Sequence, residues 1–476
     1  MGSSLIRVLT ILIILTVSFL GSGQSVFNKA FDEANTANHT SNALEYADQY
    51  YFTQKAFIGG AAVLQAICLD SNGLVVKKKP LVVDSIKNIF YGYGGAFQRL
   101  SSNEFCQLYK TGGDSTLKLV FFDDSLDVIR TVEYALNLYS GPGIVKQTND
   151  STLLLLGLVS NPSNWDIVLI NTDLQGNERW RTIFGEPGKD DYGFSIEIIN
   201  NEIFVGGQTF YNSTSVANSH LFKLTSSGQL LNDTIYNGFN NGGFLTYNEN
   251  YGLYNTGVVN KSNFLIPFLS LINSNNLSTI WEHTYFVDDT LVAPQQMIIN
   301  DNGIISISGG KLIMNEYSGW FFQTNADGDS LGSKILEHIP NESAAFNDIR
   351  PTSDGGYILA GQTDAPTQDS WIVKVNAWGC DNIPCVVSVD EKEVSKGGLN
   401  CYPNPTNGEG TISGALSTIS LPTEINVFNA MGQLVQTIPI RQKDFDLQVN
   451  IKGEGLYLVV LMQNGVVMQQ QKWVVH

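Results

Sequence analysis

The chain has 476 residues, and its 43% hydrophobic and 11% aromatic content is sufficient for a large core and excludes wholesale disorder. Charged residues make up only 15%, and the balance is acidic, with 45 Asp and Glu against 27 Lys and Arg. The net charge of −18 would repel a phosphate backbone, so we expect no nucleic-acid partner.

Residues 1–25 are typical of a secretory signal peptide. Arg7 precedes an apolar or hydroxyl run from Val8 to Leu20, and small residues follow at 21–23. This run is short for a membrane span of about 20 residues, which leaves a permanent N-terminal anchor as the alternative. No later stretch is long and apolar enough to cross a bilayer, so we expect an exported chain with no transmembrane span after signal removal.

A repeat of about fifty residues fills most of the remaining chain. Each copy has short apolar strands and a turn that begins at Asp, Asn or Thr, and the turns end at residues 73, 126, 176, 228, 276, 328 and 379. Five turns end in Gly, which supplies the positive φ of a tight hairpin, and Asn276 is expected to do so in the fifth copy. Four short strands per repeat predict an all-β fold, a seven-bladed β-propeller over residues 26–385.

The seventh copy has no outer strand of its own. Residues 26–31 match the position of the outer strand in the other copies. We therefore expect this segment to complete the last blade and to close the ring, which would leave no exposed strand edge.

The five cysteines suggest one disulfide. Cys380 and Cys385 flank a tight segment, and an exported chain permits a disulfide, so these two are the predicted pair. Cys68 and Cys106 lie in apolar strand patterns and are interpreted as small buried residues. A zinc site is disfavoured by the cysteine spacing.

After a linker predicted at 386–396, a different pattern occupies residues 397–476. Its distinctive positions are Tyr402, Pro403, Asn404, Pro405, Gly408, Gly432, Gly455 and Tyr457. The two prolines cannot donate to a sheet ladder, so they indicate an edge or turn. The strands and turns that follow predict a small antiparallel β-sandwich.

These motifs closely resemble the type A C-terminal sorting domain of the type IX secretion system of Bacteroidota. The resemblance implies export across the outer membrane, and contact of this domain with the translocation and sortase machinery. It also implies a location at the cell surface or in the extracellular medium. The repeats are similar to propeller repeats common in such cargo, which implies a fold and no activity.

Candidate sites for chemistry are few. The turn at 325–330 has oxygen ligands that suit calcium, but it coincides with the recurring hairpin turn, so no cofactor is predicted and calcium stays the alternative. The acidic pairs at 190–191 and 288–289 are interpreted as solvated loop charges. Trp320 and Trp371 are interpreted as blade core. The five histidines are scattered and no nucleophile or metal motif appears, so no catalytic residue or metal ligand is predicted.

Two classes of function therefore compete for the propeller. One is binding or adhesion at the cell surface, with an unknown ligand or glycan; the other is extracellular degradation of carbohydrate or peptide. The lack of a catalytic motif favours binding. The loops between the second and third strands vary most, and the residues predicted to face a ligand are Phe210, Tyr211, Met314 and Tyr317.

Overall fold

The computed structural model describes residues 25–33, 36–86, 88–92, 94–136, 138–148, 152–162, 164–210, 217–261, 264–285, 291–313, 316–340, 342–364, 367–381, 399–416, 423–429, 434–463 and 466–476. The predicted linker and all but the last residue of the predicted signal peptide lie outside these ranges. The elements found within them are β-strands, and none of these residues forms a helix suited to crossing a membrane. The chain divides into two compact units, Met1–Cys385 and Val386–His476.

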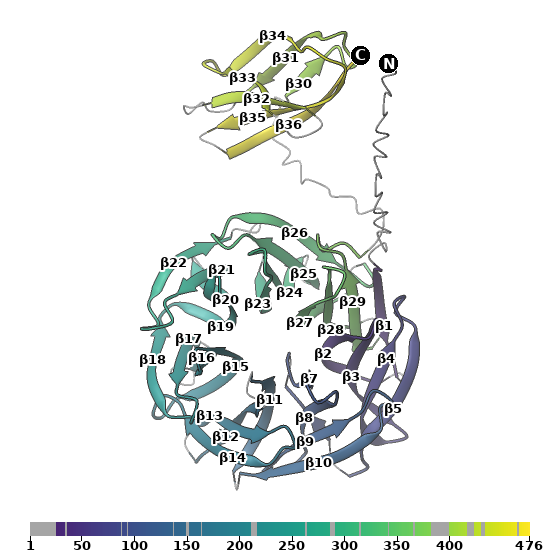
Figure 1. Ribbon diagram of the computed structural model, residues 1–476, viewed down its shortest axis with the longest axis vertical. Coiled ribbons are helices and arrows are strands. Elements are labelled where there is room, and N and C mark those ends of the chain that lie inside the picture. The colour runs from purple at the N-terminus through teal and green to yellow at the C-terminus, as the bar shows by residue number, and fades with distance from the viewer. Residues whose placement is uncertain are drawn as a thin grey trace, which may run out of the picture. The chain divides into compact units, whose positions relative to one another are not determined.

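The described strands of the first unit form seven sheets, which Figure 1 shows arranged around a common centre. Six sheets use consecutive strands. In chain order they contain β2–β5 (His39–Tyr46, Gln49–Ile58, Ala61–Leu69, Val75–Asp84), β6–β10 (Ile89–Phe90, Phe97–Arg99, Phe105–Thr111, Thr116–Phe122, Val128–Ala135), β11–β14 (Tyr139–Gln147, Thr152–Ser160, Trp165–Asp173, Glu178–Phe184), β15–β18 (Asp190–Ile199, Glu202–Phe210, Ala217–Leu224, Leu230–Tyr236), β19–β22 (Phe239–Asn248, Gly252–Lys261, Phe264–Ile272, Thr279–Thr284) and β23–β26 (Val292–Ile299, Ile305–Ile313, Glu316–Thr324, Ser330–Leu336).

The remaining sheet joins the two ends of the unit. It has the order β1 (Phe27–Phe31), β29 (Asp369–Val375), β28 (Tyr357–Thr363) and β27 (Ala344–Pro351). β1 runs antiparallel to β29, and Trp371 Nε1 donates to Asn28 Oδ1 at 2.7 Å. The N-terminal strand is thus the outer strand of the last sheet. The prediction of an all-β propeller is confirmed.

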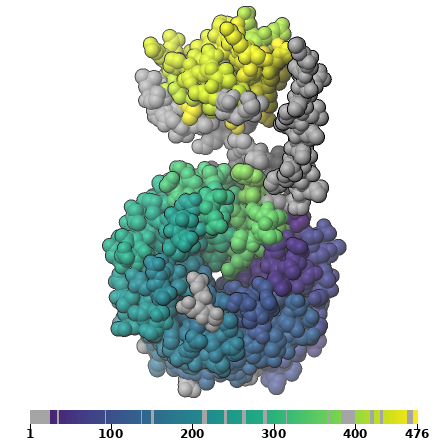
Figure 2. Space-filling view, in the orientation of Figure 1, coloured from purple at the N-terminus to yellow at the C-terminus, as the bar shows by residue number. Residues whose placement is uncertain are grey.

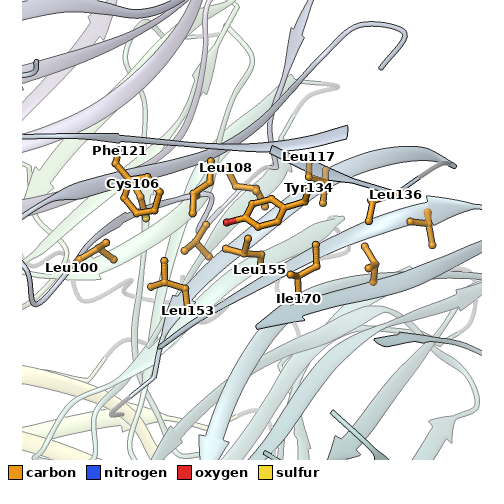
Figure 3. Packing of buried hydrophobic residues seen from close by; sticks show 14 residues of the cluster. Leu100, Cys106, Leu108, Leu117, Phe121, Tyr134, Leu136, Leu153, Leu155 and Ile170 are labelled. Carbon is orange, nitrogen blue, oxygen red and sulfur yellow. The ribbon is translucent and has the colours of Figure 1, made fainter. Parts of the chain in front are cut away.

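Apolar side chains of neighbouring sheets pack against each other and form the core. Figure 3 shows one such cluster, in which Cys106 and Tyr134 of one sheet meet Leu153 and Leu155 of the next. Central strands are apolar at consecutive positions because both of their faces are covered. Cys68 and Cys106 are unpaired and have no exposed surface, as predicted, and burial raises the pKa of both thiols.

The recurring turn glycines also hold the sheets together. At Gly228, φ is +83°, and a Cβ there would lie 2.5 Å from Cζ3 of Trp180, which belongs to the preceding sheet. The other four turn glycines make the same kind of contact with the preceding sheet; they are Gly73, Gly176, Gly328 and Gly379. The repeat therefore needs glycine both for its backbone conformation and for close packing between sheets.

The fifth turn differs from the prediction. Its positive φ of 61° falls on Leu277, not on Asn276. Leu277 N donates to Asn273 O, four residues back, whereas Gly176 N donates to Asp173 O, three residues back. The turn is one residue longer, so the left-handed position moves by one residue.

The described residues of the second unit form a small β domain with two sheets. The first has the order β30 (Asn400–Tyr402), β31 (Glu409–Ala415), β34 (Asp444–Asn450); the second has the order β33 (Leu434–Pro439), β32 (Thr423–Asn429), β35 (Gly455–Gln463), β36 (Val466–Val475). Ile412 and Phe445 of the first sheet share a core with Val459 and Trp473 of the second.

Candidate functional site

The strand registers place one side chain from each sheet at the same level of the central channel. These residues all lie in innermost strands, and we call them the channel ring: Leu44, Gln98, Lys146, Glu197, Thr246, Ile298 and Arg350. In every sheet the residue just before the ring position is apolar and buried. Because side chains alternate along a strand, the ring side chains point the other way, and Leu44 among them packs against the apolar cluster between its own sheet and the next.

Six ring residues, all except Leu44, line a cavity of about 410 Å³. Its wall also includes Asn300 and Asp301, which lie in the link between β23 and β24. The cavity therefore extends toward the edge that carries the links from first to second strands. Figure 2 shows one face of the first unit, hollowed near its centre.

A glycine-rich segment between β6 and β7 borders this cavity through Gly95. Six residues separate Phe90 from Phe97, whereas only two separate their partners Lys110 and Gln107 on β8, so the inner edge of this sheet is interrupted by an insertion. A Cβ at Gly92 would lie 2.3 Å from Gly143 O, and one at Gly94 would lie 2.7 Å from Asn347 O. The segment thus packs against the inner strands of two other sheets, which only glycine permits at these distances.

Two ion pairs, in addition to Asp301, supply charged groups at the cavity. Lys146 Nζ lies 3.1 Å from Glu197 Oε2. Arg350 Nε donates to Asp348 Oδ2 at 2.8 Å. The Asp348 side chain is 1% exposed, and its burial raises its pKa to about 6, although the Arg350 guanidinium acts to lower it.

Arg350 keeps part of its guanidinium available. Its side chain is 30% exposed and lines the cavity. The hydrogen bonds among the described residues include none from its Nη1 or Nη2. A guanidinium presents its donors in a planar fork, so this free edge is suited to an acceptor inside the cavity.

A second cluster has the composition of a catalytic triad. Asp191 accepts a hydrogen bond from Thr209 Oγ1, which lies 2.6 Å from His220 Nδ1, and His220 Nε2 lies 2.9 Å from Asp233 Oδ2. Thr209 and His220 have no exposed surface, so a substrate does not reach the hydroxyl. The cluster therefore stabilises its sheet and is not a candidate active site.

Equivalent positions in two other sheets support this structural role. Trp320 and Trp371 are fully buried, and each donates from Nε1 to the outer strand, to Ser333 at 3.0 Å and to Asn28 respectively. Their interpretation as core residues is confirmed. His220 occupies the matching place on its third strand, opposite Gly207 as Trp320 is opposite Gly309.

The interpretation of Asp191 as a solvated loop charge is wrong. It has no exposed surface, and its Oδ2 accepts from Glu186 N at 2.7 Å. The pair at 288–289 lies outside the described residues. At the turn 325–330, Asn325 Oδ1 accepts from the backbone N–H groups of Asp327 and Asp329, as a hairpin turn requires. Calcium binding at this turn stays the alternative to the prediction of no cofactor.

Only part of the predicted ligand face can be placed. Tyr211 and Met314 lie outside the described residues. Phe210 ends β16, and its ring packs edge-on against Tyr192 at 5.3 Å, while Tyr317 lies in β25 and is 38% exposed. The strands thus extend into both segments that were expected to be loops, because β24 and β25 keep pairing as far as Ile313 and Glu316.

In the second unit, the Tyr-Pro-Asn-Pro segment is attached to the last strand. Asn404 Nδ2 donates to Lys472 O at 2.8 Å, and Val474 N donates to Asn404 Oδ1 at 3.0 Å. Trp473 Nε1 donates to Pro403 O at 2.8 Å, while the Tyr402 side chain is half exposed.

The remaining sorting-motif residues are placed as follows. Pro405 lies beside Thr406, whose N donates to Val474 O. A Cβ at Gly408 would lie 2.7 Å from Ile451 O, and Tyr457 is buried with its hydroxyl 3.0 Å from Gly453 O. Gly455 begins β35, and Gly432 lies outside the described residues.

Cys380 is disulfide-bonded. Its predicted partner, Cys385, lies outside the described residues, so this pairing stays a prediction. Cys401 is buried and unpaired.

Comparison with known proteins identifies the second unit. Residues 400–476 match the family described as Secretion system C-terminal sorting domain. The second unit is therefore a sorting domain of an exported protein. It is the type IX sorting domain indicated by the sequence motifs, and it directs the chain to the cell surface or the extracellular space. A search of curated proteins found no match.

Several solved structures of low sequence identity are similar to most of this chain. The polysaccharide lyase Uly1 is 12% identical with a TM-score of 0.44, over 76% of this chain and 94% of that chain. The β-propeller domain of the Trilobed protease from Pyrococcus furiosus is 7% identical with a TM-score of 0.45, over 75% and 98%. The Pan2 WD40 domain from Neurospora crassa is 10% identical with a TM-score of 0.45, over 70% and 88%.

Proposed function

We propose that the exported propeller is a binding protein at the cell surface or in the medium, and that its ligand enters the channel cavity. The observation that carries this proposal is the free guanidinium edge of Arg350 in a cavity lined by six sheets. Concave sites with a few fixed polar groups are the usual places for small ligands. The paired Lys146 and Glu197 would orient a ligand without reacting with it.

Export would proceed from a signal peptide at residues 1–25 in a member of the Bacteroidota. The type IX translocation and sortase machinery would then recognise the C-terminal domain. Deletion of residues 397–476 tests this route: the shortened chain should stay inside the cell. Normal levels of it at the surface or in the medium would refute the route.

The binding role is tested by closing the cavity. The mature chain is incubated with libraries of organic acids, peptides and oligosaccharides, and the compounds that it retains are identified by mass spectrometry. Gln98→Trp places an indole in the channel ring, and Gln175→Trp makes the same change on an exposed turn as a control.

We expect compounds that the wild type and Gln175→Trp retain unchanged and that Gln98→Trp loses. If the wild type converts a library compound into a product, the function is extracellular degradation and not binding. Equal retention by all three proteins would mean that the binding site lies outside the cavity. The rim with Phe210 and Tyr317 would then be the next proposed contact surface.

A further inference from the structure

The geometry around Arg350 points to a specific ligand class, and this inference rests on the proposed function of the cavity. We propose that the channel cavity binds a small organic monocarboxylate with an apolar body, and that the free edge of Arg350 holds the carboxylate.

Arg350 is fixed before any ligand arrives. Its Nε is held by the buried Asp348 carboxylate, which leaves Nη1 and Nη2 as the donors without partners among the described residues. Two parallel N–H donors match the two oxygens of a carboxylate, and such bidentate charge-assisted pairs are stronger than neutral hydrogen bonds. A guanidinium oriented in advance loses less side-chain entropy when it binds.

Two aliphatic side chains lie near this edge. A Cβ built on Gly95 would lie 3.4 Å from Arg350 Nη2 and 3.2 Å from Ile144 Cγ2, so the isoleucine and the guanidinium border the same glycine. Ile298 is the ring residue of the adjacent sheet and lines the same cavity. A ligand held by Arg350 would therefore place its next atoms against aliphatic side chains, which favours an alkyl or similar body.

The charges of the cavity disfavour a ligand with two negative charges. Lys146 and Arg350 are balanced by Glu197 and Asp301 along the wall, and Asp348 lies behind Arg350. A dianion such as phosphate would meet three carboxylates and a protein of net charge −18. A monocarboxylate needs only the one free guanidinium edge.

Isothermal titration calorimetry on the full mature chain tests the inference with hexanoate, hexanamide and inorganic phosphate as probes. Arg350→Gln removes the fork, and the double variant Arg350→Gln with Asp348→Asn also removes the carboxyl that would lose its partner. Arg179→Gln, on an exposed outer strand, is the matched control. Urea unfolding checks that each variant is folded.

We expect hexanoate to bind the wild type and Arg179→Gln with the same affinity, and to bind both Arg350 variants at least tenfold more weakly. Hexanamide should bind the wild type at least tenfold more weakly than hexanoate. The inference is overturned if hexanoate does not bind at millimolar concentration, if hexanamide binds equally well, if phosphate binds more tightly, or if the double variant keeps wild-type affinity. The protein could instead retain neutral compounds in a way that requires an open cavity but does not require Arg350. That result would overturn the assignment of a carboxylate ligand, but it would support the proposed binding function.

Discussion

Substitution of Gly228 by alanine tests the role of the turn glycines directly. The new methyl group would lie 2.5 Å from Cζ3 of Trp180, where carbon atoms normally stay about 3.5–4 Å apart. The backbone at Gly228 also has φ of +83°, a conformation that costs an L-residue roughly 1–2 kcal/mol. Moving a packed indole typically costs about 1–3 kcal/mol more, and reduced freedom of the unfolded chain returns about 0.4–1 kcal/mol.

These terms predict a loss of about 2–4 kcal/mol of unfolding free energy for Gly228→Ala. Urea unfolding of the mature chain, followed by tryptophan fluorescence, should show a lower midpoint at an unchanged slope. Two controls separate the causes. Gly238→Ala has a positive φ of +85° but no atom within 4 Å of the new Cβ, and Gly332→Ala has neither constraint.

The expected order of destabilisation is Gly228→Ala, then Gly238→Ala, then Gly332→Ala, which should be close to neutral. The first variant should also cost less when Trp180 has already been replaced by leucine, since the clash is then relieved. If Gly228→Ala and Gly238→Ala are equally destabilising, only the backbone conformation matters and the reasoning about contact between sheets is refuted.

Three further variants test other features of the fold. Asn28→Ala removes the acceptor of Trp371 Nε1 in the closing sheet, so the free energy of unfolding measured with urea should fall by about 1–3 kcal/mol, and by less in a Trp371→Phe background; full additivity would contradict the pairing. Burial raises the pKa of Asp348 from 3.8 to about 6, so the stability that this group contributes below pH 4 is lost as pH rises through 6. Between these limits the free energy of unfolding of the wild type should fall by roughly 3 kcal/mol relative to Asp348→Asn. A difference that stays constant with pH would contradict the burial of Asp348 beside Arg350. Asn404→Ala should release the last strand of the sorting domain and reduce the exported fraction measured by immunoblot, and normal export would show that these two hydrogen bonds are dispensable.

Features that recur in every copy could be predicted from the sequence. The spacing of the turn glycines reveals the length of the repeat. From that repeat we could predict the sheets and the equivalent burial of Trp320 and Trp371. Features that depend on partners distant in the sequence could not be predicted. Asp191 looked like a loop charge because its partners, Thr209 and His220, follow about 20 or more residues later and meet it only when the sheet forms.

The channel ring was missed for a related reason. A search for a repeat retains the positions that stay the same, whereas the ring holds Leu, Gln, Lys, Glu, Thr, Ile and Arg at equivalent positions. Each ring residue nevertheless stands 25 to 28 residues before the first residue of its turn and directly after an apolar residue. Core packing demands the same chemistry from every sheet, while a ligand contacts each sheet with a different part of its surface. In a closed ring of similar sheets, the inward positions whose chemistry changes from copy to copy are therefore the ones through which the protein can recognise an asymmetric ligand.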